Sequence, residues 1–450
     1  MKLSKRKTLS TLILGTSCLI MSNIVGITQV QAEELILKVS SLEIKTDGGV
    51  NEAEVRRLLP ELESSDVRIG KLSKNIQLVN DTGTMKLKAQ FQPEDDGTYH
   101  VIILAEDKED LQYSVSVNNT GNDNSGNWRT TFSYTDTDLS KNADMLNLSY
   151  TTSPNNNKNV HQGSILYKWL FPNSGDSAYV NYSFSNVDMG SIAQVYGLDL
   201  YTTGNSNNLS FHYQHNFKYT SAKKQILDIG IDYKKSEGDH ELKYGDTVWV
   251  TGGYDVDEKL LSATYSDTIR RRNDSFSYNV GYTQNIDGDK EAYNNYRTGS
   301  DDKFHIFKAG LNYQYRADND WILNARINGQ YTPDNLISTE QISSGGISGV
   351  RGFKENVASG DKGVRGSVEV YSPELLKKQR MVLFTDFANL SNNKYNIGEQ
   401  SKNLASIGIG YRMMDLDGWS ITLDYARPIS SKGISDTYYK PWHLNVLKTF

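Results

Sequence analysis

Residues 227–234 read LDIGIDYK, and this pattern decides the fold of most of the chain. Leu, Ile, Ile and Tyr occupy the odd positions, while Asp, Gly, Asp and Lys occupy the even positions. A β-strand points successive side chains to opposite faces, so a period of two predicts a strand with one apolar and one polar face. Such a strand lies between an apolar environment and water.

The same alternation recurs between residues 111 and 450. Residues 276–283, FSYNVGYT, and residues 405–412, ASIGIGYR, repeat it, and clusters of Asn, Gly, Asp and Ser separate the segments. Either a soluble sandwich or a membrane barrel gives this pattern. The barrel is favoured because segments of about ten residues cross a bilayer when tilted, and because many of the 28 tyrosines lie near segment ends, where aromatic girdles form.

Composition argues against several other classes of protein. The charged fraction of 23% and the mean hydropathy of -0.57 are too polar for helical membrane spans. The formal net charge of -6 comes with no basic block, so no nucleic-acid partner is expected.

Residues 1–32 are predicted to be a secretory signal peptide. Basic residues within positions 2–7 precede an apolar run over positions 12–25, and Val30-Gln31-Ala32 provides the cleavage positions. Cys18 is the only cysteine and lies in this segment, where Gly15-Thr16-Ser17 is a poor context for lipid modification. The mature protein, starting near Glu33, is therefore expected to contain no disulfide.

Residues 34–106 are predicted to form one small α+β domain. An apolar strand at 35–44 precedes a helix capped by Asn51, a second helix follows at 69–79, and two strands complete the unit. A turn containing Pro and Gly joins those last two strands, at 84–92 and 99–104.

Residues 111–450 are predicted to form an all-β transmembrane barrel of about 16 antiparallel strands. Seventeen segments alternate, but a barrel with both ends in the periplasm needs an even number, so residues 191–204 are assigned to a loop. The long stretches 236–254, 286–301 and 333–362 then all face outward as loops. The outward face contacts outer-membrane lipid, the first partner expected.

The last strand carries a further signal. The chain ends on Phe450, with Trp442, Leu444 and Val446 on the same face. A terminal aromatic residue on an alternating strand resembles the outer-membrane assembly signal, which implies the barrel-assembly machinery as a partner during biogenesis. Lys448 departs from the apolar face, although a lysine near the interface can extend its ammonium group to water.

Residues 345–363, GGISGVRGFKENVASGDKG, lie in the longest of these stretches. Glycines on both sides of Arg351 allow sharp turns or a close approach to another surface, so Arg351 and Phe353 are the large groups left to act. A loop this rich in glycine is expected either to remain solvated or to dock against the rest of the protein.

This stretch resembles the outer-membrane transporters of two-partner secretion, of the hemolysin-activator and filamentous-hemagglutinin type (ShlB/FhaC/HecB-like). Their superfamily also contains the barrel-assembly insertases. The family's sixth extracellular loop has a Val-Arg-Gly-Phe tetrad, then Ser-Gly-Asp-x-Gly, then a strand with an acidic residue. The matching positions here are Val350-Arg351-Gly352-Phe353, Ser359-Gly360-Asp361-Lys362-Gly363 and Glu369.

Two further elements carry the resemblance, which covers roughly residues 35–450. A Phe-x-Asp-x-Gly element appears as Phe384-Thr385-Asp386-Phe387-Ala388, with alanine in place of the last glycine. The stretches 118–121 and 125–129, around the first hairpin, are similar to the family's barrel entry.

The resemblance implies that residues 34–106 are a polypeptide-transport-associated (POTRA) domain. In this family that domain captures an unfolded client, and the physical route is the addition of a client strand to an exposed sheet edge. The implied function is an outer-membrane translocase that secretes a large unfolded exoprotein, a hemolysin or adhesin. Most members carry a plug helix and two POTRA domains, whereas this chain is expected to carry one domain and no plug.

The resemblance also implies a role for Arg351, which holds the loop inside the barrel through an ionic contact with an Asp of the wall. Alternation points Asp386 and Glu369 inward, so Arg351 has two candidate partners, of which Asp386 is favoured. A planar guanidinium binds a carboxylate through two hydrogen bonds. The alternative is a solvated arginine without a partner.

Other functions remain as alternatives. An insertase that folds other barrels is the second hypothesis, and a passive porin is disfavoured because porins lack a periplasmic domain. An outer-membrane hydrolase is the enzyme alternative, although no catalytic constellation stands out. No cofactor and no metal site are expected, since His212 and His215 fall on opposite faces of a strand.

Overall fold

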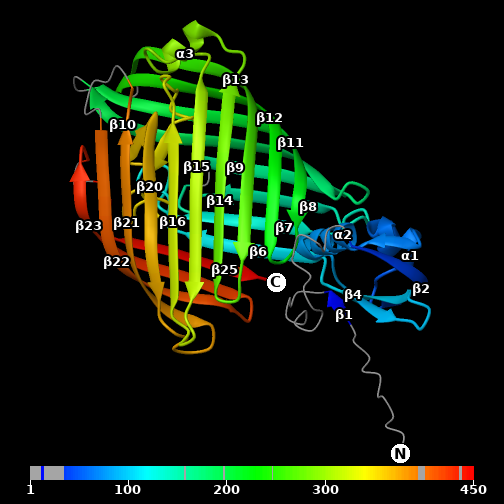
Figure 1. Cartoon of the computed structure of the whole chain (residues 1–450). Coiled ribbons are helices and arrows are strands. Elements are labelled where there is room, and N and C mark those ends of the chain that lie inside the picture. Colours follow the sequence, from blue (N-terminus) through cyan, green and yellow to red (C-terminus); the bar gives the residue numbers. More distant parts are fainter. Residues whose placement is uncertain are drawn as a thin grey trace, which may run out of the picture.

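The computed structural model describes residues 12–14, 35–156, 159–195, 198–245, 247–393, 401–434 and 438–450. Sixteen antiparallel strands close into one barrel, which confirms the predicted fold class (Figure 1). Within the described residues no helix is long and apolar enough to span a membrane. The barrel strands are β6 Leu111–Asn118, β7 Arg129–Asp136, β8 Met145–Thr152, β9 Val160–Phe171, β10 Asp176–Val195, β11 Leu198–Tyr219, β12 Lys223–Tyr244, β13 Thr247–Arg270, β14 Asp274–Asn285, β15 His305–Arg316, β16 Ile322–Tyr331, β20 Lys362–Tyr371, β21 Gln379–Ser391, β22 Ser401–Leu416, β23 Trp419–Lys432 and β25 Trp442–Thr449.

Alternation in the sequence becomes an outside and an inside of the barrel wall. On β12, the outward side chains of Ile229 and Ile231 are 50% and 57% exposed, as expected for residues that face lipid. The inward Asp228 and Asp232 instead contact His212 of the neighbouring strand, with Nδ1 to Oδ1 of Asp228 at 2.5 Å.

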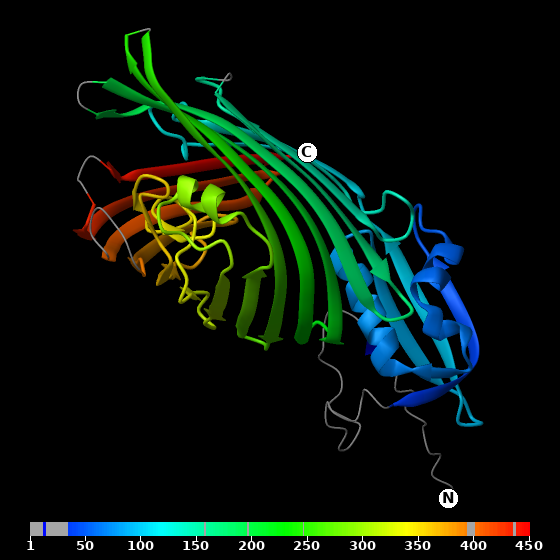
Figure 2. The same cartoon turned by 90° about the horizontal axis from the view of Figure 1, so that it is seen from above.

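The strands β10 to β13 are longer than the sequence pattern indicated. Residues 236–254 were expected to form a loop, but β12 and β13 continue through them as one hairpin, paired from Ser236↔Val256 to Tyr244↔Thr247. The assignment of residues 191–204 to a loop was also wrong, because they form the paired distal ends of β10 and β11, although they are not a separate strand. These ends project beyond the rest of the barrel (Figure 2). Polar residues do not prevent strand formation where both sheet faces meet water.

The N-terminal unit is an α+β domain beside the barrel (Figure 1). Its elements are β2 Ile36–Thr46, α1 Glu52–Leu58, a 3-10 turn at Pro60–Glu63, β3 Asp66–Arg68, α2 Ile69–Thr82, β4 Met85–Pro93 and β5 Tyr99–Asp107. The sheet order is β1-β4-β5-β2-β3, with β2 and β5 parallel, and β1 is the short strand Leu12–Leu14. Asn51 caps α1 by accepting a hydrogen bond from the backbone N–H of Ala53. The rest of the predicted signal peptide lies outside the described residues.

This domain packs against turns at one end of the barrel. Leu170 of β9 and Ala143 of the β7–β8 turn join its hydrophobic core. Asn75 of α2 donates to the carbonyl oxygen of Pro172 at 2.9 Å, and Lys224 at the start of β12 pairs with Asp81 at 2.5 Å. These contacts hold the domain against the turns that join β7 to β8, β9 to β10 and β11 to β12.

The segment between β16 and β20 folds back into the interior of the barrel. It contains β17 Ile342–Ser344, β18 Gly352–Phe353 and β19 Ala358–Gly360, and β17 pairs with β19. Its tip pairs with β24 Tyr439–Lys440, which precedes the last barrel strand. Viewed from above, this segment and α3 Lys290–Tyr296 lie within the ring of strands (Figure 2).

Candidate functional site

Glycines allow the inward segment to approach the wall. Gly352 has φ +94°, a left-handed conformation that favours glycine, and an added Cβ there would lie 3.2 Å from Cδ of Pro428. A Cβ on Gly360 would lie 2.7 Å from the backbone N and O of Ser391 in β21. These two glycines therefore place the segment directly against β23 and β21.

Arg351 lies at the tip of the segment, with 2% of its surface exposed, and contacts Asp386 of β21, which is fully buried. Nε donates to Oδ2 at 2.7 Å and Nη2 donates to Oδ1 at 2.8 Å. The backbone N–H of Arg351 donates to the same Oδ2 at 3.0 Å. This bidentate arrangement uses the planar guanidinium in a way that a lysine ammonium cannot reproduce.

Four further groups surround this guanidinium, and one of them is Ser367 of β20, whose Oγ accepts from Nη2 at 3.2 Å. Nη1 lies 2.8 Å from Oε1 of Glu369 in β20 and 3.3 Å from Oδ2 of Asp424 in β23. The guanidinium carbon lies 3.4 Å from the ring centroid of Phe384, a cation–π geometry. Arg351 thus connects one loop to three strands of the wall.

Sequence reasoning missed Asp424, Arg412 and His443. Arg412 on β22 binds Asp424 through two hydrogen bonds of 2.7 and 3.0 Å. The carboxylate of Asp424 is therefore shared between Arg351 and Arg412. Nε2 of His443 accepts a hydrogen bond from the backbone N–H of Gly352 at 3.0 Å. Inward alternation on β22, β23 and β25 was the available signal, but it selects every second residue and does not show which one meets the loop.

The apolar residues of the tetrad pack beside the ionic contact. Val350 and Phe353 are fully buried and belong to a cluster with Ala388 and Leu404 of the wall. The ring of Phe353 meets that of Tyr439 edge to face, with centroids 5.4 Å apart. Burial of these two side chains keeps water from the arginine and strengthens its ionic contacts.

Asp361, which ends the inward segment, lies apart from this group. Its carboxylate binds Arg297 of the β14–β15 loop at 2.7 Å and accepts from the backbone N–H of Asn393 at 2.9 Å. Gly360 and Asp361 therefore fix the C-terminal end of the segment, while Arg351 fixes its tip.

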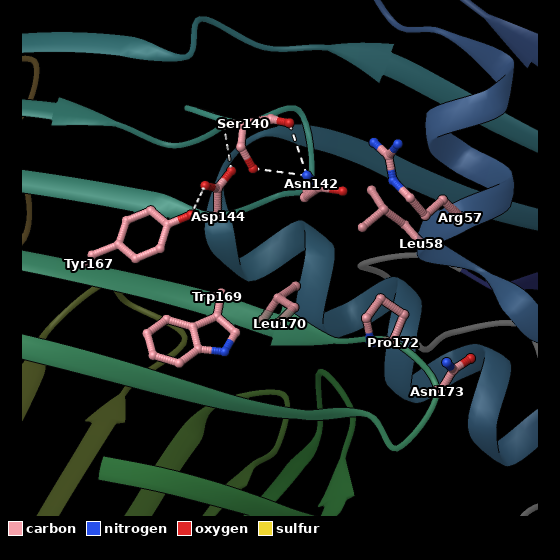
Figure 3. Close-up of a pocket in the computed structure, with 10 residues that line it drawn as sticks. All are labelled: Arg57, Leu58, Ser140, Asn142, Asp144, Tyr167, Trp169, Leu170, Pro172 and Asn173. Carbon is pink, nitrogen blue, oxygen red and sulfur yellow. Dashed lines mark hydrogen bonds between the residues drawn. The ribbon is translucent and has the colours of Figure 1, made fainter. Parts of the chain in front are cut away.

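A cavity of about 420 Å³ lies where the N-terminal domain meets the barrel (Figure 3). Arg57 and Leu58 of α1 face Asp144, Tyr167 and other residues of the β7–β8 and β9–β10 region across it. Tyr167 donates to Asp144, whose other oxygen accepts from the backbone N–H of Ser140. The polar groups of the barrel side thus bond mainly to one another. In the described part of the chain, no group of three His, Cys, Asp or Glu residues is arranged to hold a metal ion.

A family model for haemolysin secretion/activation proteins ShlB/FhaC/HecB matches residues 97–413. The chain belongs to this family. Its arginine tetrad and the following Ser-Gly-Asp-Lys-Gly stretch lie within the matched region. This match confirms the family resemblance that those motifs indicated.

Curated relatives of this ShlB/FhaC/HecB protein include two sequences of the heme/hemopexin transporter protein HuxB from Haemophilus influenzae, one of them from strain Rd. One is 22% identical over 370 residues, covering 79% of this chain and 62% of that protein. The other is 23% identical over 372 residues, with the same coverage. The chain thus spans about three fifths of the length of these relatives.

Solved structures of similar shape include CdiB from Escherichia coli, with a TM-score of 0.75 and 17% identity over 92% of this chain and 77% of that one. CdiB from Acinetobacter baumannii gives 0.72 and 16%, over 92% and 74%. BamA from Haemophilus ducreyi lacking POTRA domains 1-3 gives 0.54 and 15%, over 92% and 85%. The likeness supports the fold, and the family places the barrel in the outer membrane with its N-terminal domain in the periplasm.

Proposed function

We propose that this ShlB/FhaC/HecB protein is the outer-membrane translocase of a two-partner secretion system. A large unfolded exoprotein, a hemolysin or adhesin, is captured by the POTRA domain at residues 34–106 and passes through the barrel at residues 111–450. The observation that carries the proposal is a loop drawn into the lumen and fastened there by Arg351, Asp386 and Glu369. The short strands of this loop are not part of the barrel sheet, so the loop can move aside without unfolding the barrel.

Capture is supported by an open edge of the POTRA sheet. The outer edge of β4 pairs only with β1, at Leu12↔Phe91, Ile13↔Gln90 and Leu14↔Ala89, among the described residues. Because β1 lies in the predicted signal peptide, this edge is free once that peptide is removed. Its unpaired backbone groups suit an extended client strand, with loose demands on client sequence.

A photo-cross-linking side chain at Gln90 tests this capture step. Gln90 lies on β4 at the open edge, and Leu104 on the central strand β5, which is paired with β2 on one side and β4 on the other, provides a matched control position. Capture at the edge predicts client adducts from position 90 and not from position 104. Equal labelling at both positions, or labelling at 104 alone, would contradict strand addition at this edge.

Deletion of the gene tests the whole function. A translocase predicts that one large protein disappears from the medium, while other outer-membrane proteins keep their levels. A general fall in outer-membrane proteins would contradict the proposal and point to an insertase.

The protein also needs outer-membrane lipid around the barrel and the barrel-assembly machinery during its own biogenesis.

A further inference from the structure

Asp361 accepts hydrogen bonds from four donors in three separate parts of the chain. Its carboxylate is fully buried, and its Oδ1 accepts from Arg297 at 2.7 Å, from the backbone N–H of Leu336 at 3.1 Å and from Gln341 at 2.9 Å. Oδ2 accepts from the backbone N–H of Asn393 at 2.9 Å. A carboxylate is the one common side-chain group that accepts from so many donors at once.

These donors come from the loops on one side of the barrel. Arg297 directly follows α3 in the β14–β15 loop, Leu336 and Gln341 belong to the inward segment, and Asn393 follows β21. The same Arg297 also donates to the carbonyl oxygen of Leu336. Asp361 therefore joins three loops that are distant in sequence and that lie opposite the POTRA domain (Figure 1).

Apolar packing covers the contact. Tyr293 of α3 is fully buried with Phe304, Leu336 and Ile337, and these residues continue onto Val256 and Leu260 of β13. The β14–β15 loop is thus folded inward over the inward segment, within the ring of strands (Figure 2). The two loops therefore lie side by side inside the ring of strands, at the end of the barrel opposite the POTRA domain.

The contact is separate from the Arg351 group. Arg351 bonds to Ser367, Glu369, Asp386 and Asp424, and Asp361 bonds to none of these residues. Arg297 and Asp361 are 16% and 0% exposed at their side chains, so the pair lies mostly away from water. Loss of one partner leaves the other charge buried without compensation.

We infer that Arg297 and Asp361 form a latch that closes the extracellular mouth of the barrel. The latch ties the β14–β15 loop to the base of the inward segment, and it must open before a polypeptide can leave. Its closing action is independent of the proposed function, because it acts on ions as well as on a client. Its role in export rests on the proposed translocation.

Ion current through the purified full-length protein in a planar lipid bilayer tests the latch. Arg297→Ala and Asp361→Asn are each expected to raise the fraction of time spent open about tenfold, the factor that corresponds to about 1.4 kcal/mol. Arg316→Ala is the matched control, since Arg316 pairs with Asp320 in the exposed β15–β16 turn. Wild-type open times for both folded latch variants would overturn the inference.

A second variant keeps the test decisive if those substitutions disturb folding. Asp301 and Asn335 face each other across the same two loops, with the backbone N–H of Asp301 donating to the carbonyl oxygen of Asn335 at 2.8 Å. Oxidation of an Asp301→Cys/Asn335→Cys pair should hold the mouth shut, and reduction should restore the current. An oxidised pair that conducts like the wild type contradicts the latch.

The same cysteine pair separates the two proposals. If oxidation stops both the ion current and client secretion, the latch and its role in export are supported. If oxidation stops the ion current but no exoprotein requires this protein for its secretion, the latch is supported and the proposed translocation function is wrong.

Discussion

Arg351 owes its importance to burial more than to its charge. A solvated ion pair contributes little to stability, whereas removal of one partner from a buried pair costs about 3–5 kcal/mol. Arg351→Ala would leave Asp386 buried without its arginine, whereas Asp424 would keep Arg412, so the inward segment should be released. The sixteen strands pair with one another and not with the inward segment, so the barrel should still assemble.

We expect Arg351→Ala to reduce client secretion strongly while leaving the amount of folded barrel unchanged. Exoprotein in the medium measures the first quantity, and the heat-dependent gel mobility of the barrel measures the second. Arg351→Lys should restore part of the secretion, because it keeps the charge and loses the bidentate geometry. Normal secretion by folded Arg351→Ala would show that the loop does not need this anchor.

The two acidic partners of Arg351, Asp386 and Glu369, should contribute unequally to holding the loop. Asp386 accepts three hydrogen bonds from Arg351 and one from Ser367 at 2.6 Å, whereas Glu369 lies near one guanidinium nitrogen and also accepts from Tyr371. Asp386→Asn is therefore predicted to expose the loop to added protease more than Glu369→Gln does. A larger effect at Glu369 would reverse the assignment of the main partner.

At this scale the sequence was informative only in part. The spacing of Arg351, Glu369 and Asp386 in recognisable motifs singled out these residues, and the structure brings them within bonding distance. Asp424 and His443 lie on strands with no distinctive motif. Their part in the site depends on how the barrel closes, and that is a property of the whole sheet.

Among the elements, α1 carries a buried acid at the junction with the barrel. Burial raises the pKa of Glu54 from 4.5 to about 7, with Asp138 adding to the rise while Lys141 and Arg57 oppose it. Burial also raises the pKa of Asp138, which pairs with Lys141 at 3.2 Å. Asp110 is the other carboxylate that pairs with Lys141.

The sign of the pH effect follows from the raised pKa of Glu54. A carboxyl group whose pKa is higher in the folded state stabilises that state fully below its unfolded pKa, and this contribution disappears as pH rises through the folded value. The junction should therefore loosen between pH 4.5 and about 7, by at most about 3 kcal/mol. Hydrogen-exchange protection factors of the α1 amides should fall over this range.

Glu54→Gln provides the control, because a neutral amide cannot titrate and should largely remove the pH dependence of those protection factors. An unchanged pH dependence in that variant would assign the effect to another group, such as Asp138.

The element scale also shows what periodicity could not supply. The alternation located each barrel strand. It predicted that β12 ends near residue 235 and that β13 begins near residue 255, because the apolar face stops there. Backbone pairing continues as a water-exposed hairpin that needs no apolar face. The inward course of the long segment also left no periodic signal, since glycine backbone geometry and single ionic contacts set it.

At the scale of the whole molecule, the barrel closes at a seam between its last strand β25 and its first strand β6. β25 pairs with β6 over five positions, from Asn445↔Asn118 to Thr449↔Ser114, fewer than the seven of its other neighbour β23. An insertase would pass its substrates sideways through such a seam, whereas the proposed translocase uses the lumen. A bond across the seam distinguishes the two routes.

Ser116 and Leu447 face each other across this seam, which suits a disulfide because paired positions in antiparallel strands have Cα atoms about 4.5–5.5 Å apart. The only native cysteine is Cys18, within the predicted signal peptide, so it should not interfere. We expect oxidised Ser116→Cys/Leu447→Cys protein to secrete its client at the wild-type rate, measured as exoprotein in the medium with and without reductant. Secretion that stops on oxidation and returns on reduction would mean that the seam must open, and export through a closed barrel would be wrong.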